Sequence, residues 1–335
     1  MSADGLHPDP PLSGPPVGDA TQASGVGARG YPHPLLVSVG DLMVDVAVEA
    51  PALARGGDVA GAVRLGAGGS AANVAAWAVA AGGRARLVAG RGDDLAGRLL
   101  AAALEERGIG LHPAAPAGSV TGAMLVVMEA GERTFVADPG ANLDLRQGDV
   151  VTGLDGAAAV FVSGYPLLRP ATRGAAMAAA AAAGRAGTPA VVDAASWPLL
   201  GGGAGEPVLA AAALAGTLLA NRDEAAALAG PRDPEAAATR LAGRVGTVVV
   251  KCGAAGVVVC AVGRPATPVP APPVAAVDVT GAGDAFAAAY LLARAGGADP
   301  AEAARAGTRL AARAVTTRGA WPLGALPSGG AAEYP

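Results

Sequence analysis

Residues 278 to 284 read Asp-Val-Thr-Gly-Ala-Gly-Asp and lead into a helical pattern with Phe286, Ala289, Tyr290 and Ala293 on one face. A glycine-rich turn that begins a helix directs several backbone N–H groups to one point at the positive end of the helix dipole, which makes an anion site. A Cβ at Gly281 or Gly283 would hold a phosphate away from the backbone or forbid the turn. Asp284 falls in the first turn, where we expect the local field to favour its ionised form and so its use as a general base. Alone, the segment also fits an ordinary capped helix with two solvated acids; with the next one, it predicts phosphoryl transfer.

The second glycine-rich segment, Leu65-Gly-Ala-Gly-Gly-Ser-Ala-Ala-Asn73, also enters a predicted helix, whose buried stripe would contain Val74, Trp77, Ala78 and Ala81. Gly68 and Gly69 would let a polyhydroxyl ligand approach the backbone closely, and the Asn73 amide can both donate and accept hydrogen bonds. The rival interpretation is a dinucleotide fingerprint. It is disfavoured because the segment is not the first strand-turn-helix unit and follows the polar stretch 55–64.

Together the two segments resemble the two signatures of the ribokinase-like (PfkB) carbohydrate kinase family, and the resemblance extends over residues 35–327. It implies an ATP-dependent phosphotransferase that acts on a hydroxyl of a small sugar or sugar-like molecule. It makes Asp284 the catalytic base and the amides of Gly281, Ala282 and Gly283 the anion hole. It also makes Asp45, at the end of Gly40-Asp-Leu-Met-Val-Asp45, an acceptor-binding residue together with Gly68, Gly69 and Asn73.

The resemblance further implies ATP and Mg²⁺ as cofactors and, in many members, a monovalent cation such as K⁺. Asn221-Arg-Asp-Glu224 matches the family's Asn-x-x-Glu motif, in which Glu224 would organise Mg²⁺ largely through water. From the residues alone, a helix cap by Asn221 is the expected role. The remaining candidates are Lys251, Gly253, Gly256, Thr280 and Thr308 on the nucleotide side, and Asp278 at the monovalent-cation site.

Two departures from the family pattern bear on the acceptor. Ser70 stands where ribokinases usually have lysine, and Tyr165 stands where they have a ribose-binding glutamate. Ribose is therefore not favoured, and a nucleoside kinase of pseudouridine, cytidine or adenosine type is the main alternative. A non-catalytic sugar or nucleotide sensor is less favoured because the intact Thr-Gly-Ala-Gly-Asp segment would then have no purpose. A nicotinamide oxidoreductase is more distant still.

The elements that must position these residues alternate in type. Short apolar runs lie between helical stretches, at residues 35–40, 87–89, 123–129, 159–163, 190–193, 217–220, 247–251 and 256–262. Such alternation predicts an α/β fold of three layers, with a mostly parallel central sheet and helices on both faces. Asp299-Pro-Ala-Glu302 and Asp233-Pro234 are typical of helix starts.

Two Val-rich regions, about 44–64 and 115–137, break this alternation and predict a small antiparallel β lid, through which some relatives form homodimers. The kinase domain is expected over 35–327. It lies between a disordered Pro/Gly-rich tail at residues 1–34 and a C-terminal tail at 328–335.

Bulk properties exclude several classes. A net charge of −4 with no basic run disfavours nucleic acid and favours small-molecule partners. Lys251, the only lysine, lies in Val-Lys-Cys, so the chain has no Walker A loop. Cys252 and Cys260 suggest no disulfide framework, no apolar stretch predicts a membrane span, and we expect a cytoplasmic protein.

Overall fold

The computed structural model describes residues 33–112, 118–129 and 132–322, so nearly all of the predicted N-terminal tail and the whole predicted C-terminal tail lie outside it. A nine-stranded sheet has the order β13-β12-β11-β10-β9-β8-β1-β4-β5. Its strands are β1 (Leu35–Gly40), β4 (Arg84–Ala89), β5 (Gly110–His112), β8 (Ala159–Val162), β9 (Ala190–Asp193), β10 (Thr217–Asn221), β11 (Thr247–Lys251), β12 (Val257–Ala261) and β13 (Thr267–Val269). Pairing is parallel except where β12 and β13 add antiparallel strands at one edge.

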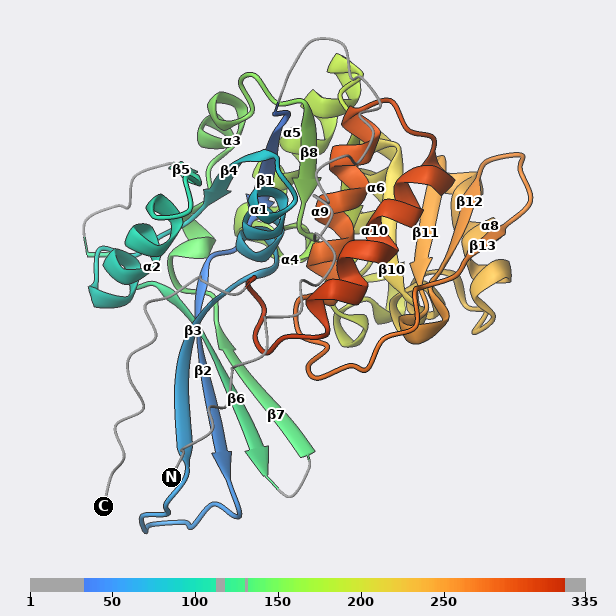
Figure 1. The fold of residues 1–335 in the computed structure, drawn as a ribbon. Helices are drawn as coiled ribbons and strands as arrows, with labels where there is room; N and C mark the ends of the chain where they lie inside the picture. The colour runs from blue at the N-terminus through green and yellow to red at the C-terminus, as the bar shows by residue number, and fades with distance from the viewer. Residues whose placement is uncertain (1–32, 113–117, 130–131, 323–335) are drawn as a thin grey trace, which may run out of the picture. The chain divides into compact units, whose positions relative to one another are not determined.

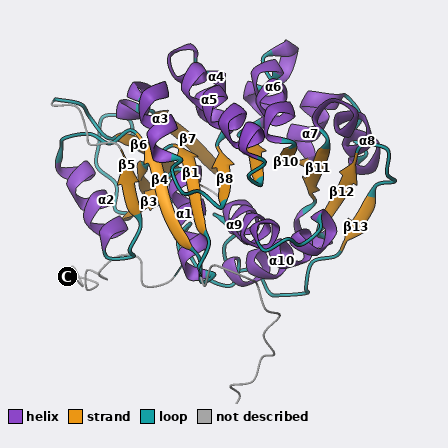
Figure 2. Cartoon of the chain, turned by 90° about the horizontal axis from the view of Figure 1, so that it is seen from above, coloured by secondary structure: helices purple, strands orange, loops and turns teal. Residues whose placement is uncertain are grey.

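Helices cover both faces of this sheet, as Figure 2 shows from above. They are α1 (Ser70–Ala80), α2 (Leu95–Glu105), α3 (Gln147–Gly153), α4 (Gly164–Leu168), α5 (Pro170–Ala186), α6 (Glu206–Ala215), α7 (Arg222–Ala229), α8 (Pro234–Val245), α9 (Ala282–Ala295) and α10 (Pro300–Ala314). Successive residues of a strand point to opposite faces of the sheet, so they belong to two different hydrophobic cores. Val249 packs with the residues of α1, α9 and α10, whereas Val248 and Val250 pack with those of α5, α6 and α8. The three-layer α/β prediction is confirmed.

The predicted lid is a separate four-stranded sheet of order β3-β2-β6-β7, and Figure 1 shows these strands side by side. They are β2 (Met43–Ala50), β3 (Ala62–Gly68), β6 (Gly122–Glu129) and β7 (Glu132–Asp138). The expectation of an all-antiparallel lid is wrong in one place, because the central pair, β2 and β6, is parallel.

The glycine-rich segment before α1 also differs from expectation. Residues up to Gly68 belong to β3, and the turn is formed by Gly69 alone, whose φ of 94° favours glycine. On α1, Val74, Trp77 and Ala78 are buried as predicted, but Ala81 is exposed because the helix ends before it.

Helix starts follow the sequence closely. Asp299 and Glu302 form a reciprocal capping box at α10, and Asp233 accepts a hydrogen bond from the N–H of Ala236 at α8. Across the described ranges, none of the helices combines the length and apolarity that crossing a bilayer would require.

Candidate active site

Asp284 lies in the first turn of α9, as predicted, and its carboxylate faces α1. Its Oδ1 accepts a hydrogen bond of 2.8 Å from the Ser70 hydroxyl, and its Oδ2 accepts one of 2.8 Å from Asn73 Nδ2. Ser70 and Asn73 are held three residues apart on one helix, so the two signatures of the sequence meet at this carboxylate. Its partners also hold the carboxylate in one orientation.

The electrostatics of Asp284 correct one expectation. Burial raises the pKa of Asp284 to about 7, although the hydrogen bonds from Asn73 and Ser70 and the charge of Lys251 lower it. Desolvation therefore outweighs the local field that we expected to keep the carboxylate ionised. A carboxyl group with this pKa can exchange a proton near neutral pH, which suits a general base better than an ordinary aspartate would.

The turn before α9 has the predicted geometry. Gly281 is the N-cap with a φ of 76°, and a Cβ there would lie 2.5 Å from the carbonyl oxygen of Ala320. Within the part of the chain that the structure describes, the N–H groups of Gly281 and Gly283 donate no hydrogen bond, while Ala282 donates a long one of 3.3 Å to Val279. Two amides therefore remain available to an anion, and the third is partly engaged.

Lys251 supplies a cation beside this turn. A Cβ on Gly283 would lie 3.3 Å from Lys251 Nζ, so the ammonium group is adjacent to the turn. Lys251 Nζ also donates a hydrogen bond of 2.6 Å to Asp193 Oδ2, and both side chains are largely buried. Burial alone would lower the pKa of Lys251, but the carboxylates of Asp193 and Glu224 raise it above its ordinary value. Lys251 thus keeps its charge.

Asp193 was not among the predicted site residues. The signal that could have found it is its position as an acid at the end of a predicted strand, in the same sheet as Lys251 and two strands away. The next residues have an unusual backbone, because Ala195 has a φ of 79°. Its N–H lies 3.2 Å from Asp193 Oδ1, which helps to hold this turn.

Asp45, the predicted acceptor-binding acid, lies on β2 against the end of β3. A Cβ on Gly68 would be 2.1 Å from Asp45 Oδ1, so only glycine at residue 68 leaves room for this carboxylate. Burial, and to a smaller extent the charge of Asp41, raises the pKa of Asp45 to about 6. The need for glycine at residue 68 thus follows from the Asp45 side chain, whether or not a ligand also approaches Gly68.

Asp41 is a further residue that the sequence analysis missed. It is buried, and it accepts hydrogen bonds from the Ser70 N–H and the Ser163 hydroxyl, each 2.9 Å long. Burial raises the pKa of Asp41 despite these bonds. Asp41 therefore fixes the start of α1, which places the Ser70 hydroxyl against Asp284.

Asn73 and Tyr165 differ in whether their side chains make hydrogen bonds within the described residues. The Asn73 side chain is engaged at both ends, because its Oδ1 accepts a hydrogen bond from the Trp321 indole and its Nδ2 donates to Asp284. Tyr165, on α4, donates no hydrogen bond within the described residues. Burial, followed by the charges of Asp41 and Asp193, raises the pKa of Tyr165 to about 12, so the phenol stays neutral beside these acids.

Asn221 and Glu224 form the helix cap that the residues alone suggest. Asn221 Oδ1 accepts a hydrogen bond from the Glu224 N–H, and the two Glu224 oxygens accept from the N–H and Nδ2 of Asn221. Burial and the charge of Asp193 raise the pKa of Glu224 to about 7, although Lys251 lowers it. Asp193, Lys251 and Glu224 are therefore one electrostatic group with Asp284.

The other predicted nucleotide-side residues are less closely linked to this group. Gly253 faces open space, whereas a Cβ on Gly256 would lie 2.1 Å from the Val269 carbonyl oxygen, so the need for glycine there comes from β13. The Thr308 hydroxyl donates to the Arg305 carbonyl. Thr280 donates twice to Asp278 Oδ1, and the Gly319 N–H donates to Asp278 Oδ2.

Comparisons with known proteins agree with this geometry. A family model described as "pfkB family carbohydrate kinase" matches residues 33–323. A search of curated proteins found no match. Among solved structures, an adenosine kinase from Sinorhizobium meliloti is 22% identical, with 88% of this chain and 97% of that chain covered and a TM-score of 0.72.

Two further solved structures match over similar lengths. A ribokinase from Thermotoga maritima is 24% identical, with 88% and 96% of the two chains covered and a TM-score of 0.71. An aminoimidazole riboside kinase from Salmonella enterica, complexed with aminoimidazole riboside and an ATP analog, is 27% identical, with coverages of 88% and 96% and a TM-score of 0.69. These structures share the ribokinase-like fold.

Proposed function

Because the chain belongs to the pfkB family of carbohydrate kinases, we propose that it transfers the γ-phosphoryl group of ATP to a hydroxyl of a small sugar or sugar-like molecule. The observation that carries the proposal is the meeting of a partly buried carboxylate, Asp284, with a charged lysine and a glycine turn in which two amides donate no hydrogen bond within the described residues. Phosphoryl transfer needs these three parts in one place: a base for the incoming hydroxyl, donors for the equatorial oxygens and a cation near the phosphates.

In the proposed reaction the acceptor hydroxyl attacks the γ-phosphorus in line, and the bond from that phosphorus to the β,γ-bridging oxygen breaks, so ADP leaves. Asp284 takes the hydroxyl proton. Asn73 donates to Oδ2 and cannot accept there, which leaves Oδ1 to receive the proton as the Ser70 hydroxyl rotates. The amides of Gly281 and Gly283, with that of Ala282, and the Lys251 ammonium stabilise the transferred group.

The acceptor is proposed to lie against Asp45, Gly68, Gly69, Asn73 and Tyr165. Asp45 offers a carboxylate and Tyr165 a phenol, and both groups are suited to binding hydroxyl groups. Asn221, Gly253, Gly256, Thr280 and Thr308 are proposed to contact ATP.

The family implies Mg²⁺, which in such sites compensates the charge of the phosphates. The described residues contain no group of three or more His, Cys, Asp or Glu side chains that could hold a metal ion. Both Glu224 oxygens accept N–H groups of Asn221, so Glu224 fits an ion held through water better than one bound directly. Asp278 is the proposed monovalent-cation ligand.

Acceptor-dependent release of ADP tests the proposal. We expect turnover with at least one member of a panel of pentoses, hexoses, keto-deoxy sugar acids and nucleosides. Asp284→Asn should lower kcat about 10² to 10⁴-fold with little change in ATP affinity. The matched control is Asp149→Asn, which changes a first-turn acid of α3. Near-normal turnover by Asp284→Asn would refute the role of Asp284, and ATP binding without any acceptor-dependent turnover would favour a sensor.

A nucleoside acceptor is the second candidate. Tyr165 places an aromatic ring where the family's ribokinases have an acid, and an aromatic ring can stack on a base. The same panel decides, since a nucleoside kinase would turn over nucleosides at least tenfold faster than free pentoses.

The resemblance to the family also suggests a homodimer, and we propose a cytoplasmic location as well. The lid exposes the apolar side chains of Val63, Leu65, Phe135 and Val136, which supports a homodimer through this sheet. Sedimentation of the wild type and of Leu65→Glu would test the dimer. A cytoplasmic location is proposed from the two free thiols, Cys252 and Cys260.

A further inference from the structure

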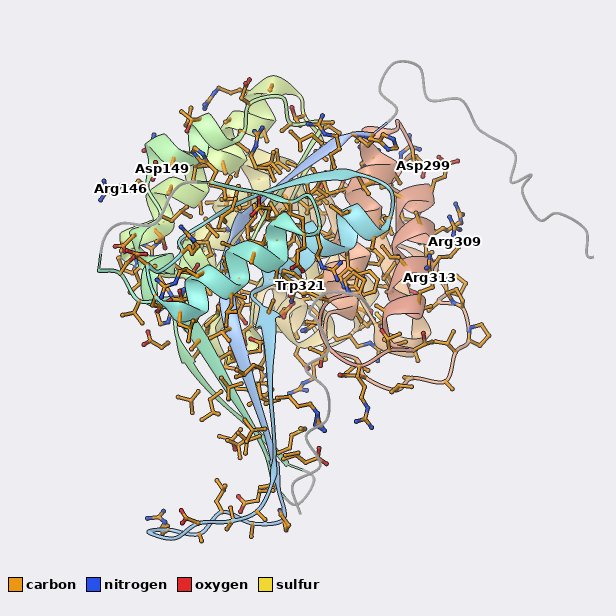
Figure 3. All side chains as sticks on the ribbon, turned by 60° about the vertical axis from the view of Figure 1, so that its left-hand side comes forward. Arg146, Asp149, Asp299, Arg309, Arg313 and Trp321 are labelled. Carbon is orange, nitrogen blue, oxygen red and sulfur yellow. The ribbon has the colours of Figure 1, made fainter. Side chains whose placement is uncertain are left out.

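Trp321, far from the base in the sequence, is connected to it in the fold. Its indole Nε1 donates a hydrogen bond of 2.8 Å to Asn73 Oδ1, across 248 residues of chain. Trp321 and Asn73 are only 5% and 7% exposed, so water does not compete for this bond. In Figure 3 Trp321 lies among the packed side chains, whereas Arg309 and Arg313 point outward from α10.

An indole nitrogen can donate a hydrogen bond but cannot accept one. The Trp321 contact therefore decides which way the Asn73 amide faces, with Oδ1 toward Trp321 and Nδ2 toward Asp284. If the indole N–H were lost, the amide could turn over and place its oxygen against Oδ2 of Asp284. That arrangement would repel the carboxylate and remove the N–H that holds it.

The turn that contains Trp321 is fastened on several sides. The Trp77 indole donates a hydrogen bond of 2.8 Å to the Ala320 carbonyl. The Arg107 guanidinium lies over the Trp321 ring, 5.5 Å from its centroid, and donates to the Pro322 carbonyl. Two indoles thus hold the same turn to α1, but only that of Trp321 leads on to Asp284.

We propose that Trp321 is a positioning residue for the catalytic base: its indole N–H orients the Asn73 amide, which in turn holds Asp284 Oδ2 and leaves Oδ1 to take the acceptor's proton. This inference rests on the proposed function. It gives Asn73 a task that does not require contact with the acceptor, and it adds a residue from the end of the described chain to the site.

Other titratable groups also lie near Asp284. They are Lys251 on β11, Asp193 on β9, Glu224 on α7 and the neutral phenol of Tyr165 on α4. None of them hydrogen-bonds Trp321 or Trp77 within the described residues, so exchanging either indole leaves these four groups in place. If the pKa of Asp284 shifts in Trp321→Phe but not in Trp77→Phe, the shift is therefore assigned to the Asn73 amide.

The decisive comparison is Trp321→Phe against Trp77→Phe. Each variant removes one indole N–H that holds the turn, and each keeps a six-membered aromatic ring. For Trp321→Phe we expect kcat to fall about tenfold, which is the lower end of the loss seen when a residue that orients a metal-binding side chain is removed. The acidic limb of the plot of kcat against pH should move to higher pH, and KM for ATP should not change. Trp77→Phe should lower the melting temperature to a similar extent but leave the acidic limb in place. Equal kinetic losses, or an unmoved limb in Trp321→Phe, would overturn the proposal.

A second measurement does not depend on turnover. In wild-type protein with ¹⁵N-labelled tryptophan, the indole signal of Trp321 should shift with pH as Asp284 titrates, at about pH 7, while that of Trp77 should not. Asp284→Asn should abolish this shift. A Trp321 signal that ignores pH, or that titrates equally in Asp284→Asn, contradicts the connection.

If Trp321→Phe fails to fold, Asn73→Asp tests the same connection, because it keeps an acceptor for the Trp321 N–H and replaces the donor to Asp284 with a carboxylate oxygen. The acidic limb of the plot of kcat against pH should then move to higher pH than the limb expected for Trp321→Phe. A limb that stays at the wild-type position would contradict the connection from Trp321 through Asn73 to Asp284. Failure of the kinase proposal is recognised separately, as wild-type protein that binds ATP but shows no acceptor-dependent turnover. The labelled indole still reports on the connection in that case.

Discussion

Gly68 and Asp45 face each other so closely that a Cβ on Gly68 would lie 2.1 Å from Asp45 Oδ1. We therefore expect Gly68→Ala to displace the Asp45 carboxylate and to lower kcat/KM for the acceptor about tenfold or more, since the group proposed to bind the acceptor's hydroxyls would be misplaced. KM for ATP should change little. Gly66→Ala on the same strand is the matched control, because nothing lies within 4 Å of a Cβ there. Steady-state kinetics of both variants measures the difference, and equal effects would argue against the role of Asp45.

Catalysis should depend on pH through Asp284. Only the deprotonated carboxylate can take the acceptor's proton, and the pKa of this group is raised to about 7 by burial. The value of kcat should therefore rise about tenfold per pH unit well below 7 and level off above it. Asp45→Asn should keep this limb, because the role proposed for Asp45 is acceptor binding and not proton transfer. A flat kcat between pH 5.5 and 8.5 would contradict Asp284 as the base, provided that chemistry limits turnover.

Folding stability should fall as pH rises from about 5 to 8. Burial raises the pKa values of Asp284 and Glu224 to about 7 and that of Asp45 to about 6, from ordinary values of 3.8 or 4.5. In this range the folded chain keeps protons that the unfolded chain has lost, so raising the pH favours unfolding. Asp94 and Glu206, whose pKa values are lowered, act in the opposite sense only at more acidic pH.

The melting temperature should accordingly be higher at pH 5 than at pH 8, and the difference should shrink in Asp284→Asn. Calorimetry in buffers of equal ionic strength measures both quantities. A melting temperature that climbs across this interval would show that these carboxyl groups are more hydrated than the structure indicates.

Lys251 and Asp193 should depend on each other for stability. Lys251→Met leaves the Asp193 carboxylate, whose side chain is 13% exposed, without its cation, which typically costs about 3–5 kcal/mol. The double variant Asp193→Asn, Lys251→Met removes the uncompensated charge and should recover most of this loss. Urea unfolding of the two single variants and the double variant gives the coupling energy. Additive losses would mean that the pair is not coupled.

Lys251→Met should also move the acidic limb of the kcat profile upward, because the Lys251 charge lowers the pKa of Asp284. Asp193→Asn should move this limb downward, since Asp193 raises the same pKa. Opposite shifts of this kind would not arise from a general loss of stability.

Local signals predicted much of the fold. The strands at residues 35–40, 190–193 and 247–251 have the predicted ends, because apolar runs of that length are bounded by glycine, helix-capping or charged residues. The cap at Asn221 needs only residues 221–224, and it formed as the residues alone suggest. β5 and β13 were missed because each has only three residues and no apolar run that distinguishes it from a loop.

The contacts that complete the site join distant parts of the chain. Trp321 and Asn73 are 248 residues apart, and Lys251 and Asp193 are 58 apart, so no local pattern announces either pair. The pKa of Asp284 was misjudged for a related reason. The electrostatic field at the N-terminus of α9 can be predicted from residues 278–284 alone. The burial of the Asp284 carboxylate, however, depends on the side chains that α1 and the central strands place around it.

The single lysine gives this protein an unusual chemical property. Amine-directed reagents, including nucleotide analogues that carry an aldehyde or an active ester, have one ε-amino target in all 335 residues. Its close pairing with Asp193 makes that target slow to react at rest. If ATP binds beside Lys251 as proposed, modification of this lysine, followed by mass spectrometry, would report nucleotide binding at a single position without any engineered probe.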